Sequence, residues 1–334
     1  MEMIKRLLDG EVLSTAETQR LFQHLVKGEL TEIQITGILT AMKLRGEQPT
    51  EMAGAAQALR VAAKPFVRPD RLIVDSCGTG GDGSNTINIS TTAALAAASM
   101  GLTVAKHGNR SVSSRSGSAD VLESLGLSVT QDPAIAAEQL DRFNFCFLFA
   151  PHYHPGIRYA MPVRQTLKTR TLFNLLGPLV NPARPDVQQL GVYDPNWCRP
   201  LAETLRLLGC QRAMVVHGSG LDEMALHDST FVVELKDGEL HEYELNPEDF
   251  GVQRAAIAEL RGGDADFNAK ALQQVLAGTA ADPQLNAVAM SVAGLLYLAD
   301  RYDNFNAATA AAREHLASGA ALHHLQQLQE FNRG

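Results

Sequence analysis

A glycine-rich polar stretch in the first third of the sequence has the residue types and spacing to bind an anion. It places four glycines within six positions, at 78, 80, 81 and 83. Glycines at this density let backbone N–H groups close around a ligand where side chains would not fit, which suits phosphate oxygens. Ser90 or Thr91 can then cap an alanine-rich helix that runs to about residue 100. The stretch therefore predicts a phosphate-type site.

The same glycines also match a dinucleotide-binding pattern, because Gly78, Gly80 and Gly83 have the spacing G-x-G-x-x-G. That pattern requires an acidic residue about 20 residues further on, which binds the ribose of the cofactor. The sequence has no Asp or Glu between residues 83 and 119, whereas basic residues stand at 106, 110 and 115. In a chain of net charge −8, this indicates a ligand with more negative charge than a dinucleotide.

A second polar stretch, residues 106–118, reads KHGNRSVSSRSGS. It follows a predicted strand and precedes a predicted helix, as the first stretch does. Both are therefore expected at the carboxyl end of one sheet, where open α/β folds bind ligands. A mobile surface loop is the alternative interpretation of a basic, serine-rich segment. Its pairing with the first stretch favours a binding role.

Two adjacent acids, Asp222 and Glu223, follow a third predicted strand in the segment HGSGLDEM. Neighbouring carboxylates repel each other unless a cation lies between them or they face apart. Oxygen ligands beside a phosphate site suggest Mg²⁺, which retains water and substrate phosphate in its coordination shell. The alternative is that one of the acids simply caps a helix.

Arg164 is a candidate for binding a carboxylate, because a guanidinium can donate two parallel hydrogen bonds to one. It shares a predicted helix with Lys168 and Arg170, so a solvated basic face is the alternative. His107 is a candidate proton carrier, as are the histidines at 152 and 154, which could instead bind backbone groups in their proline-flanked loop. No general base is assigned.

The elements that must position these residues divide into two kinds. Residues 1–64 read as helices, with capping boxes at Ser14 and Thr31 and a third cap at Thr50. Residues 71–157 and 183–334 alternate strands with helices, which predicts a mostly parallel sheet covered by helices on both faces. Residues 158–182 carry helical patterns only and are expected to join the small helical domain. The predicted strands are 72–75, 103–106, 145–149, 188–192, 213–217 and 231–235.

Composition bounds the functional class. The chain has 334 residues, a pI of about 5.7 and 45% hydrophobic residues, which argues against a nucleic-acid binder. Its four cysteines form no C-x-x-C pair, so a reducing cytoplasm is expected rather than a disulfide framework. Charged residues near the N-terminus exclude a signal peptide, and the most apolar helices are too short to span a bilayer.

Four long segments together resemble a known family, and the similarity runs over nearly the whole chain. They are GTGGDGSNTINIST, AKHGNRSVSSRSGSADVLESLG, FLFAPHYHPGIRYAMPVRQTLKTRTLFNLLGPLVNP and VVHGSGLDE, and they resemble signature segments of the anthranilate phosphoribosyltransferases. The resemblance implies transfer of the phosphoribosyl group of 5-phosphoribosyl 1-diphosphate to anthranilate, the second step of tryptophan biosynthesis from chorismate. It also implies Mg²⁺, a cytoplasmic homodimer, and a nucleoside phosphorylase/phosphoribosyltransferase-like α/β fold with a small helical domain.

The resemblance carries site roles onto matching positions of this sequence. The metal positions are Ser90, Asp222 and Glu223, and the anthranilate positions are Gly78, Asn109 and Arg164. Arg115 stands where the family often has lysine, which keeps the charge. The phosphoribosyl-diphosphate positions are Gly78, Gly81, Asp82, Thr86, Asn88, Ile89, Ser90, Thr91, Lys106, His107, Gly108, Asn109, Arg110, Ser111, Val112, Ser113, Ser114 and Ser118.

Two other functions are alternatives on the same sequence. Pyrimidine-nucleoside phosphorylases share the fold, but they resemble K-x-S-T-G-G at the first loop and lack the KHGNR segment. A nucleic-acid-binding relative with the fold but no activity should show a basic groove, which the net charge of −8 and the intact acidic pair oppose.

Overall fold

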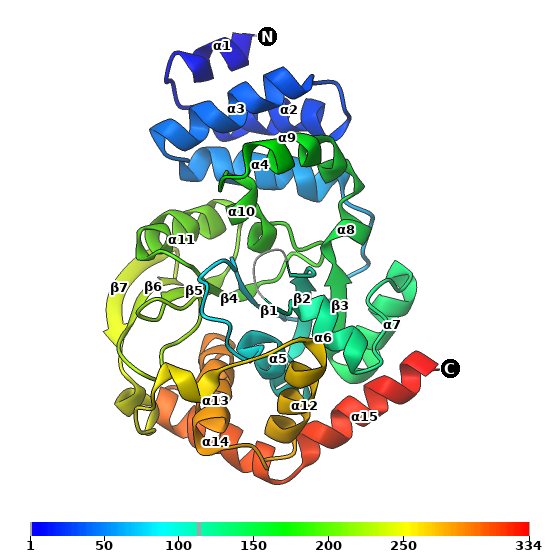
Figure 1. The fold of residues 1–334 in the computed structure, drawn as a ribbon, viewed down its shortest axis with the longest axis vertical. Coiled ribbons are helices and arrows are strands. Elements are labelled where there is room, and N and C mark those ends of the chain that lie inside the picture. The colour runs from blue at the N-terminus through cyan, green and yellow to red at the C-terminus, as the bar shows by residue number, and fades with distance from the viewer. Residues whose placement is uncertain (1, 112–114, 334) are drawn as a thin grey trace.

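The computed structural model describes residues 2–111 and 115–333 and consists of a helical bundle on top of an α/β body (Figure 1). The bundle contains the four N-terminal helices. Ser14 and Thr31 each form the predicted capping box, which fixes where the second and third helices begin. These helices are α1 (Glu2–Leu8), α2 (Thr15–Val26), α3 (Glu32–Arg45) and α4 (Pro49–Ala62).

The predicted cap at Thr50 is wrong, because α4 begins one residue earlier, at Pro49. Proline suits the first helical position, where its fixed φ matches the helix and its missing N–H is not needed. The Thr50 hydroxyl instead donates to the carbonyl of Leu13, at 3.2 Å. It therefore ties α4 to the loop before α2.

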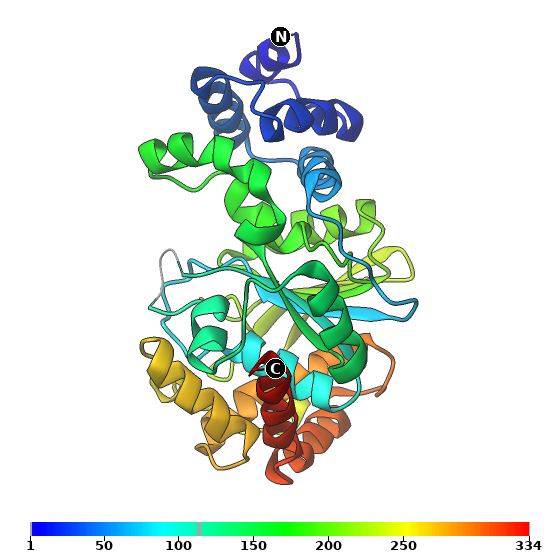
Figure 2. The same cartoon turned by 90° about the vertical axis from the view of Figure 1, so that its right-hand side faces the viewer.

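The chain returns to the bundle after the third strand. Val163, Leu172 and Phe173 of this returning segment share a hydrophobic core with Phe22 and Leu25 of α2. Figure 2 shows the bundle and the α/β body from the side, with the returning segment beside the N-terminal helices. The returning elements are α8 (Ala150–Tyr153), η1 (Pro155–Ala160), α9 (Met161–Leu167), α10 (Phe173–Leu176) and η2 (Gly177–Leu179).

A seven-stranded sheet in the order β3-β2-β1-β4-β5-β6-β7 forms the centre of the α/β body. The pairs among the first five strands in that order are parallel, and β6 and β7 are added antiparallel. This confirms the mostly parallel sheet. The strands are β1 (Ile73–Gly78), β2 (Thr103–Gly108), β3 (Phe145–Phe149), β4 (Val187–Gly191), β5 (Arg212–His217), β6 (Thr230–Lys236) and β7 (Glu239–Leu245).

Strand β7 was missed by sequence reasoning. Its residues, ELHEYEL, include three glutamates and are mostly exposed or partly exposed, as is typical of the edge of a sheet. The signal lay in the preceding turn, where Asp237 and Gly238 both have positive φ, at 53° and 80°. An Asp-Gly pair between two strands is a strong indication of a two-residue hairpin.

Helices cover both faces of the sheet. Alternate residues of β1 enter different cores: Val74 packs with α5 and α13, and Cys77 packs with α11 and the helical bundle. Strands buried on both faces therefore do not show the alternation of apolar and polar residues that a half-exposed strand has. The helices are α5 (Ile89–Ser99), α6 (Ser118–Ser124), α7 (Pro133–Phe143), η3 (Pro195–Trp197), α11 (Cys198–Leu207), η4 (Pro247–Phe250), η5 (Ile257–Leu260), α12 (Ala265–Leu276), α13 (Asp282–Leu298), α14 (Phe305–Ala317) and α15 (Ala320–Arg333).

The order of the strands creates a switch point between β1 and β4. After β1 the chain proceeds to α5 on one face, and after β4 it proceeds to α11 on the other. Such a reversal opens a crevice at the carboxyl ends of the two strands, where ligands bind in α/β sheets. Within the described ranges, no helix is long and apolar enough to cross a membrane.

Candidate functional site

Three loops from distant parts of the sequence meet at this crevice. They are residues 79–88 after β1, the described residues 109–111 and 115–117 after β2, and residues 218–229 after β5. The N–H of Gly80 donates to Oδ2 of Asp222 at 2.6 Å, and the N–H of Asp222 donates to Oδ2 of Asp82 at 3.3 Å. Asn88 in turn donates to the carbonyl of Ser116 at 3.4 Å. The first two polar stretches and the acidic pair thus belong to one site.

Glycines at the strand ends let the acidic loop lie directly on the sheet. Gly78 and Gly191 are paired at the ends of β1 and β4. A Cβ on Gly78 would lie 2.4 Å from Oδ2 of Asp222, and one on Gly191 would lie 1.6 Å from its carbonyl oxygen. Neither position tolerates a side chain, so the two glycines seat Asp222 in the switch-point crevice.

The acidic pair lies partly exposed at the N-terminus of α5, where Oε1 of Glu223 accepts from the N–H of Ser90 at 2.9 Å. Burial, together with the negative charge of Asp82, raises the pKa of Asp222 to about 7. Burial and the charge of Asp222 raise the pKa of Glu223 to about 8. No basic side chain of the described residues forms an ion pair with either acid.

The donors present fit Mg²⁺ better than a metal with a complete protein cage. Across residues 2–111 and 115–333, no three His, Cys, Asp or Glu side chains form a ready metal cluster. Mg²⁺ needs only one or two carboxylates, because water and substrate phosphates complete its shell. The side chains of Asp222 and Glu223, with Ser90 beside them, are oxygen donors of this kind, and a bound cation would lower the pKa values that burial raises.

The first glycine loop is also held by residues from the C-terminal part of the chain, around the start of α12. Thr86 forms a bridge with Arg261, and Oδ1 of Asn88 accepts from Asn268 of α12 at 2.7 Å. The side chains of Ile89 and Thr91 are buried in the first turn of α5, so a substrate could contact these two positions only through their backbone. Sequence reasoning missed Asn268, because nothing links its local sequence to a loop 180 residues earlier.

Lys106 and His107, both predicted site residues, are buried in β2 on opposite faces of the sheet. Nζ of Lys106 donates to the carbonyl of Ser76, and its charge partly offsets the raised pKa of Glu223. Nδ1 of His107 lies 3.1 Å from the carbonyl oxygen of Gly177. Burial lowers the pKa of His107 well below its usual range, so this imidazole is neutral at physiological pH.

The second loop is folded onto its own helix. Asn109 accepts through its carbonyl from Ser118 at 3.3 Å, and Asp120 of α6 accepts from the N–H of Ser111 at 3.0 Å. Arg110 donates to Glu123 at 2.7 Å, so its guanidinium is paired with α6. A Cβ on Gly108 would lie 2.3 Å from Oγ of Ser118, so glycine is required at that turn. The predicted positions Val112, Ser113 and Ser114 lie outside the described residues.

Arg164 lies in α9 with its guanidinium 5.3 Å from the centre of the Phe173 ring. Burial lowers its pKa, and it forms no ion pair within the described part of the chain. Arg170, which sequence reasoning placed on the same helix, lies beyond it. Its guanidinium donates to the carbonyl of Gly81 and stacks on Tyr193 at 3.7 Å. The returning segment thus contacts the first glycine loop directly.

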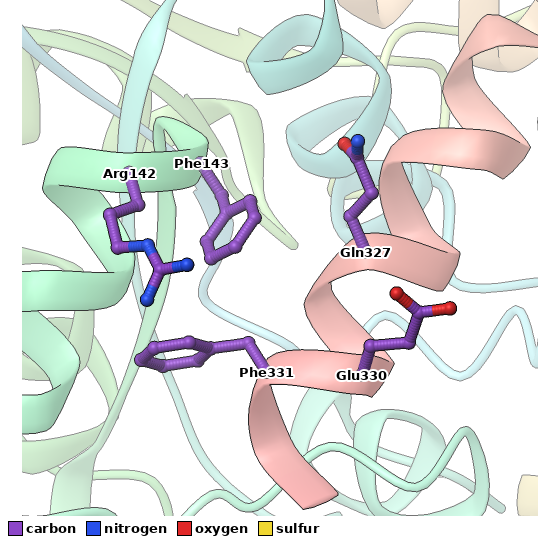
Figure 3. Close-up of a pocket in the computed structure, with 5 residues that line it drawn as sticks. All are labelled: Arg142, Phe143, Gln327, Glu330 and Phe331. Carbon is purple, nitrogen blue, oxygen red and sulfur yellow. The ribbon is translucent and has the colours of Figure 1, made fainter. Parts of the chain in front are cut away.

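A surface hollow of about 560 Å³ elsewhere on the molecule is not part of this site (Figure 3). Its walls come from the end of α7 and from α15. The guanidinium of Arg142 lies 5.2 Å from the ring centre of Phe143 and 5.1 Å from that of Phe331. Because α7 leads into the start of β3, this hollow lies near the amino-terminal ends of the strands, whereas the three loops lie at the carboxyl ends.

Comparison with known proteins places the whole chain in one group. Residues 70–322 match the α/β domain of a glycosyl transferase family, and residues 1–63 match its helical bundle domain. The anthranilate phosphoribosyltransferase of Idiomarina loihiensis is 64% identical over 330 residues, covering 99% of this chain and 98% of that protein. The enzyme of the same name from Shewanella oneidensis is 53% identical over 326 residues, covering 96% and 94%.

Solved structures agree with these sequences. The anthranilate phosphoribosyltransferase of Thermus thermophilus superposes with a TM-score of 0.95 at 43% identity and covers all of both chains. The enzyme from Saccharomyces cerevisiae, in complex with PRPP and Mg, superposes with a TM-score of 0.90 at 27% identity. That match covers 99% of this chain and 96% of the yeast chain.

Proposed function

The chain belongs to the anthranilate phosphoribosyltransferase family, and on this basis we propose how its site performs the reaction of that family. The protein transfers the phosphoribosyl group of 5-phosphoribosyl 1-diphosphate to the amine of anthranilate. The products are N-(5-phosphoribosyl)anthranilate and diphosphate, and the reaction is a step of tryptophan biosynthesis.

The observation that carries the proposal is the seating of Asp222 on Gly78 and Gly191 at the switch point. It brings the acidic pair within hydrogen-bond distance of the first glycine loop. Backbone N–H groups of that loop and of the first turn of α5 would bind the diphosphate. The substrate positions that the family signature implies lie at the ends of β1 and β2, in the loops after them and in the first turns of α5 and α6, and Val112, Ser113 and Ser114 lie outside the described residues. They are Gly78, Gly81, Asp82, Thr86, Asn88, Ile89, Ser90, Thr91, Lys106, His107, Gly108, Asn109, Arg110, Ser111, Val112, Ser113, Ser114 and Ser118.

Asp222, Glu223 and Ser90 are the proposed ligands of Mg²⁺. The yeast relative is described in complex with PRPP and Mg, and the residues of this site fit the ion. When bound, the ion supplies positive charge next to the diphosphate. The chain itself supplies further positive charge through Lys106 and Arg110, and Arg110 must exchange Glu123 for a substrate phosphate to do so.

Positioning and electrostatics provide the acceleration in this proposal. Loss of diphosphate builds positive charge on the ribose ring and negative charge on the leaving group. Arg164 and Asn109 hold anthranilate so that its amine faces C1 of the ribose, and Gly78 leaves room at the strand end. The amine is already a nucleophile, so no general base is required. The neutral His107 is not assigned that role.

The helical domain, residues 1–64 with 158–182, is proposed to carry the dimer interface. Leu8 of α1 is 62% exposed, and Ile33 and Leu44 of α3 are 85% and 81% exposed. A cluster of exposed apolar side chains on neighbouring helices is the kind of surface that a second copy covers. Analytical ultracentrifugation tests this homodimer. A cytoplasmic location is consistent with the four cysteines, which are all unpaired.

A fluorescence assay of anthranilate consumption tests the function. The purified protein, mixed with anthranilate, PRPP and Mg²⁺, should consume anthranilate, and EDTA should stop the reaction. Arg164→Ala should raise the KM for anthranilate at least about tenfold more than the KM for PRPP, because it removes a bidentate contact to the carboxylate. Arg158→Ala, at an exposed arginine of the same segment, is the matched control. Equal effects on both KM values would contradict the role of Arg164.

A further inference from the structure

Both imidazole nitrogens of His217, at the end of β5, have backbone partners. Nδ1 lies 2.8 Å from the carbonyl oxygen of Val192, and Nε2 lies 3.0 Å from the backbone nitrogen of Gly220. A carbonyl can only accept and a backbone N–H can only donate. Nδ1 must therefore carry the proton and Nε2 must accept. Only the neutral Nδ1–H tautomer satisfies both contacts.

The turn that His217 contacts has an unusual backbone. Gly218 and Leu221 exchange two hydrogen bonds, at 3.0 and 3.1 Å, and so close a tight turn. Its two central residues, Ser219 and Gly220, have φ values of +47° and +101°. A left-handed conformation at a serine costs about 1 kcal/mol or more and persists only where surrounding contacts fix it. Those contacts include the hydrogen bond that the N–H of Gly220 donates to Nε2 of His217 and the one that the Ser219 hydroxyl donates to the Ser229 carbonyl, at 2.9 Å. Nε2 of His227 also lies 3.2 Å from the carbonyl oxygen of Ser219.

This turn leads directly into the acidic pair. Asp222 is the next residue after it, and a Cβ on Gly218 would lie 2.3 Å from the carbonyl oxygen of Glu223. Val192, the other partner of His217, is the first residue after β4 and donates to the carbonyl of Val216 at 2.9 Å. His217 therefore joins the acidic turn to the end of β4, which is one side of the switch-point crevice.

We propose that His217 is a positioning residue for the cation-dependent binding of 5-phosphoribosyl 1-diphosphate. Its imidazole fixes the 218–221 turn relative to β4 and thereby holds the Asp222 and Glu223 carboxylates where a divalent cation and the diphosphate meet. The role rests on the proposed function, and it requires no contact between His217 and substrate. No site role was assigned to His217 by the sequence motifs, although it precedes the acidic pair by only five positions.

Three variants separate the two hydrogen bonds. His217→Gln keeps an acceptor near Nε2 for the Gly220 N–H, His217→Asn keeps a donor near Nδ1 for Val192, and His217→Phe keeps the ring alone. His241→Phe, at an exposed histidine of β7, is the matched control. Titration calorimetry measures the Kd for PRPP at fixed Mg²⁺, and ¹⁵N spectra of the imidazoles show which nitrogen of His217 carries the proton. Thermal unfolding of each variant shows that it is folded.

The expected result is that His217→Phe weakens PRPP binding about tenfold, because it removes both hydrogen bonds of the imidazole and leaves the 218–221 turn unfixed. His217→Gln should bind within about threefold of the wild type, because it preserves the bond to the acidic turn. The KM for anthranilate should not change in any variant, and the wild-type spectrum should show a protonated Nδ1.

Two results would overturn the inference alone: normal PRPP binding by His217→Phe, or equal losses in the Gln and Phe variants. Failure of the wild-type protein to bind PRPP with Mg²⁺ present would overturn the proposed function, and the role of His217 with it.

Discussion

Two glutamates of this protein lie at helix N-termini but differ in the charge of their neighbours. Glu51 lies in the first turn of α4 in the helical domain and is fully buried. It accepts from the N–H of Leu13 at 3.1 Å and forms an ion pair with Arg45. Glu223 contacts the first turn of α5 through Ser90 and is partly exposed to the crevice. It has another acid, Asp222, as its neighbour instead of an arginine.

The difference separates a structural acid from a functional one. The chain supplies the cation for Glu51, so the local charge is balanced in every state of the protein. For Asp222 and Glu223 the described chain supplies no ion-pair partner. Burial and the charge of Asp82 raise the pKa of Asp222 to about 7, and burial and the charge of Asp222 raise the pKa of Glu223 to about 8. A partly exposed acid whose charged form destabilises the folded protein is a candidate for binding a cation, because the cation would offset that charge.

Neutralising the functional pair should produce the largest effect. The double variant Asp222→Asn, Glu223→Gln should lose at least about a thousandfold in kcat/KM, because the charge that holds the cation is gone. It should also be more stable than the wild type without metal at pH 8. The raised pKa values mean that the folded state binds more protons than the unfolded chain, so wild-type stability falls as pH rises from about 4 through about 8.

The gain in unfolding free energy at pH 8 should be on the order of several kcal/mol, since each unit of raised pKa corresponds to about 1.4 kcal/mol, and it should shrink toward acidic pH. Urea unfolding at several pH values measures it, and steady-state kinetics measures the loss of activity. A variant that loses stability at pH 8 would show that the pair is structural, as Glu51 is.

Removing the structural acid should give the opposite pattern. Glu51→Gln leaves the mostly buried Arg45 guanidinium without its countercharge. Breaking such a pair costs about 3 kcal/mol or more of unfolding free energy. Because Glu51 lies away from the three loops, kcat/KM per folded molecule should stay within about twofold of the wild type. Urea unfolding and the fluorescence assay, run on the same preparation, check both values. A large loss of kcat/KM with unchanged stability would remove the contrast between the two glutamates.

Much of the framework was predictable because its signals are local. The capping boxes at Ser14 and Thr31, the apolar strands and the glycines of the first loop each show in a few consecutive residues. The acidic pair was predictable too, because Asp222 and Glu223 are adjacent in the sequence and neighbouring carboxylates repel each other unless a cation lies between them or they face apart. These features together predicted the mostly parallel sheet, and they grouped the two loops with the acidic pair.

The remainder depends on contacts between distant residues. Nothing in the sequence near Gly191 shows that Asp222 will lie on it, because that contact forms only when β4 pairs with β1. Arg170 reaches Gly81 over 89 positions, and its role is visible only once the returning segment is folded onto the bundle. Arg110 was expected to face the ligand, and its pairing with Glu123 across the second loop had no local signal.

Titration of the wild-type protein with PRPP in a calorimeter, with Mg²⁺ or with EDTA, tests most directly whether the acidic pair needs an external cation. With Mg²⁺ we expect binding that releases protons to the buffer and weakens as pH falls from about 8.5 to about 6.5, since protons and the cation compete for Asp222 and Glu223. With EDTA we expect little or no binding. Equal affinity in both solutions, with no proton release, would contradict the account.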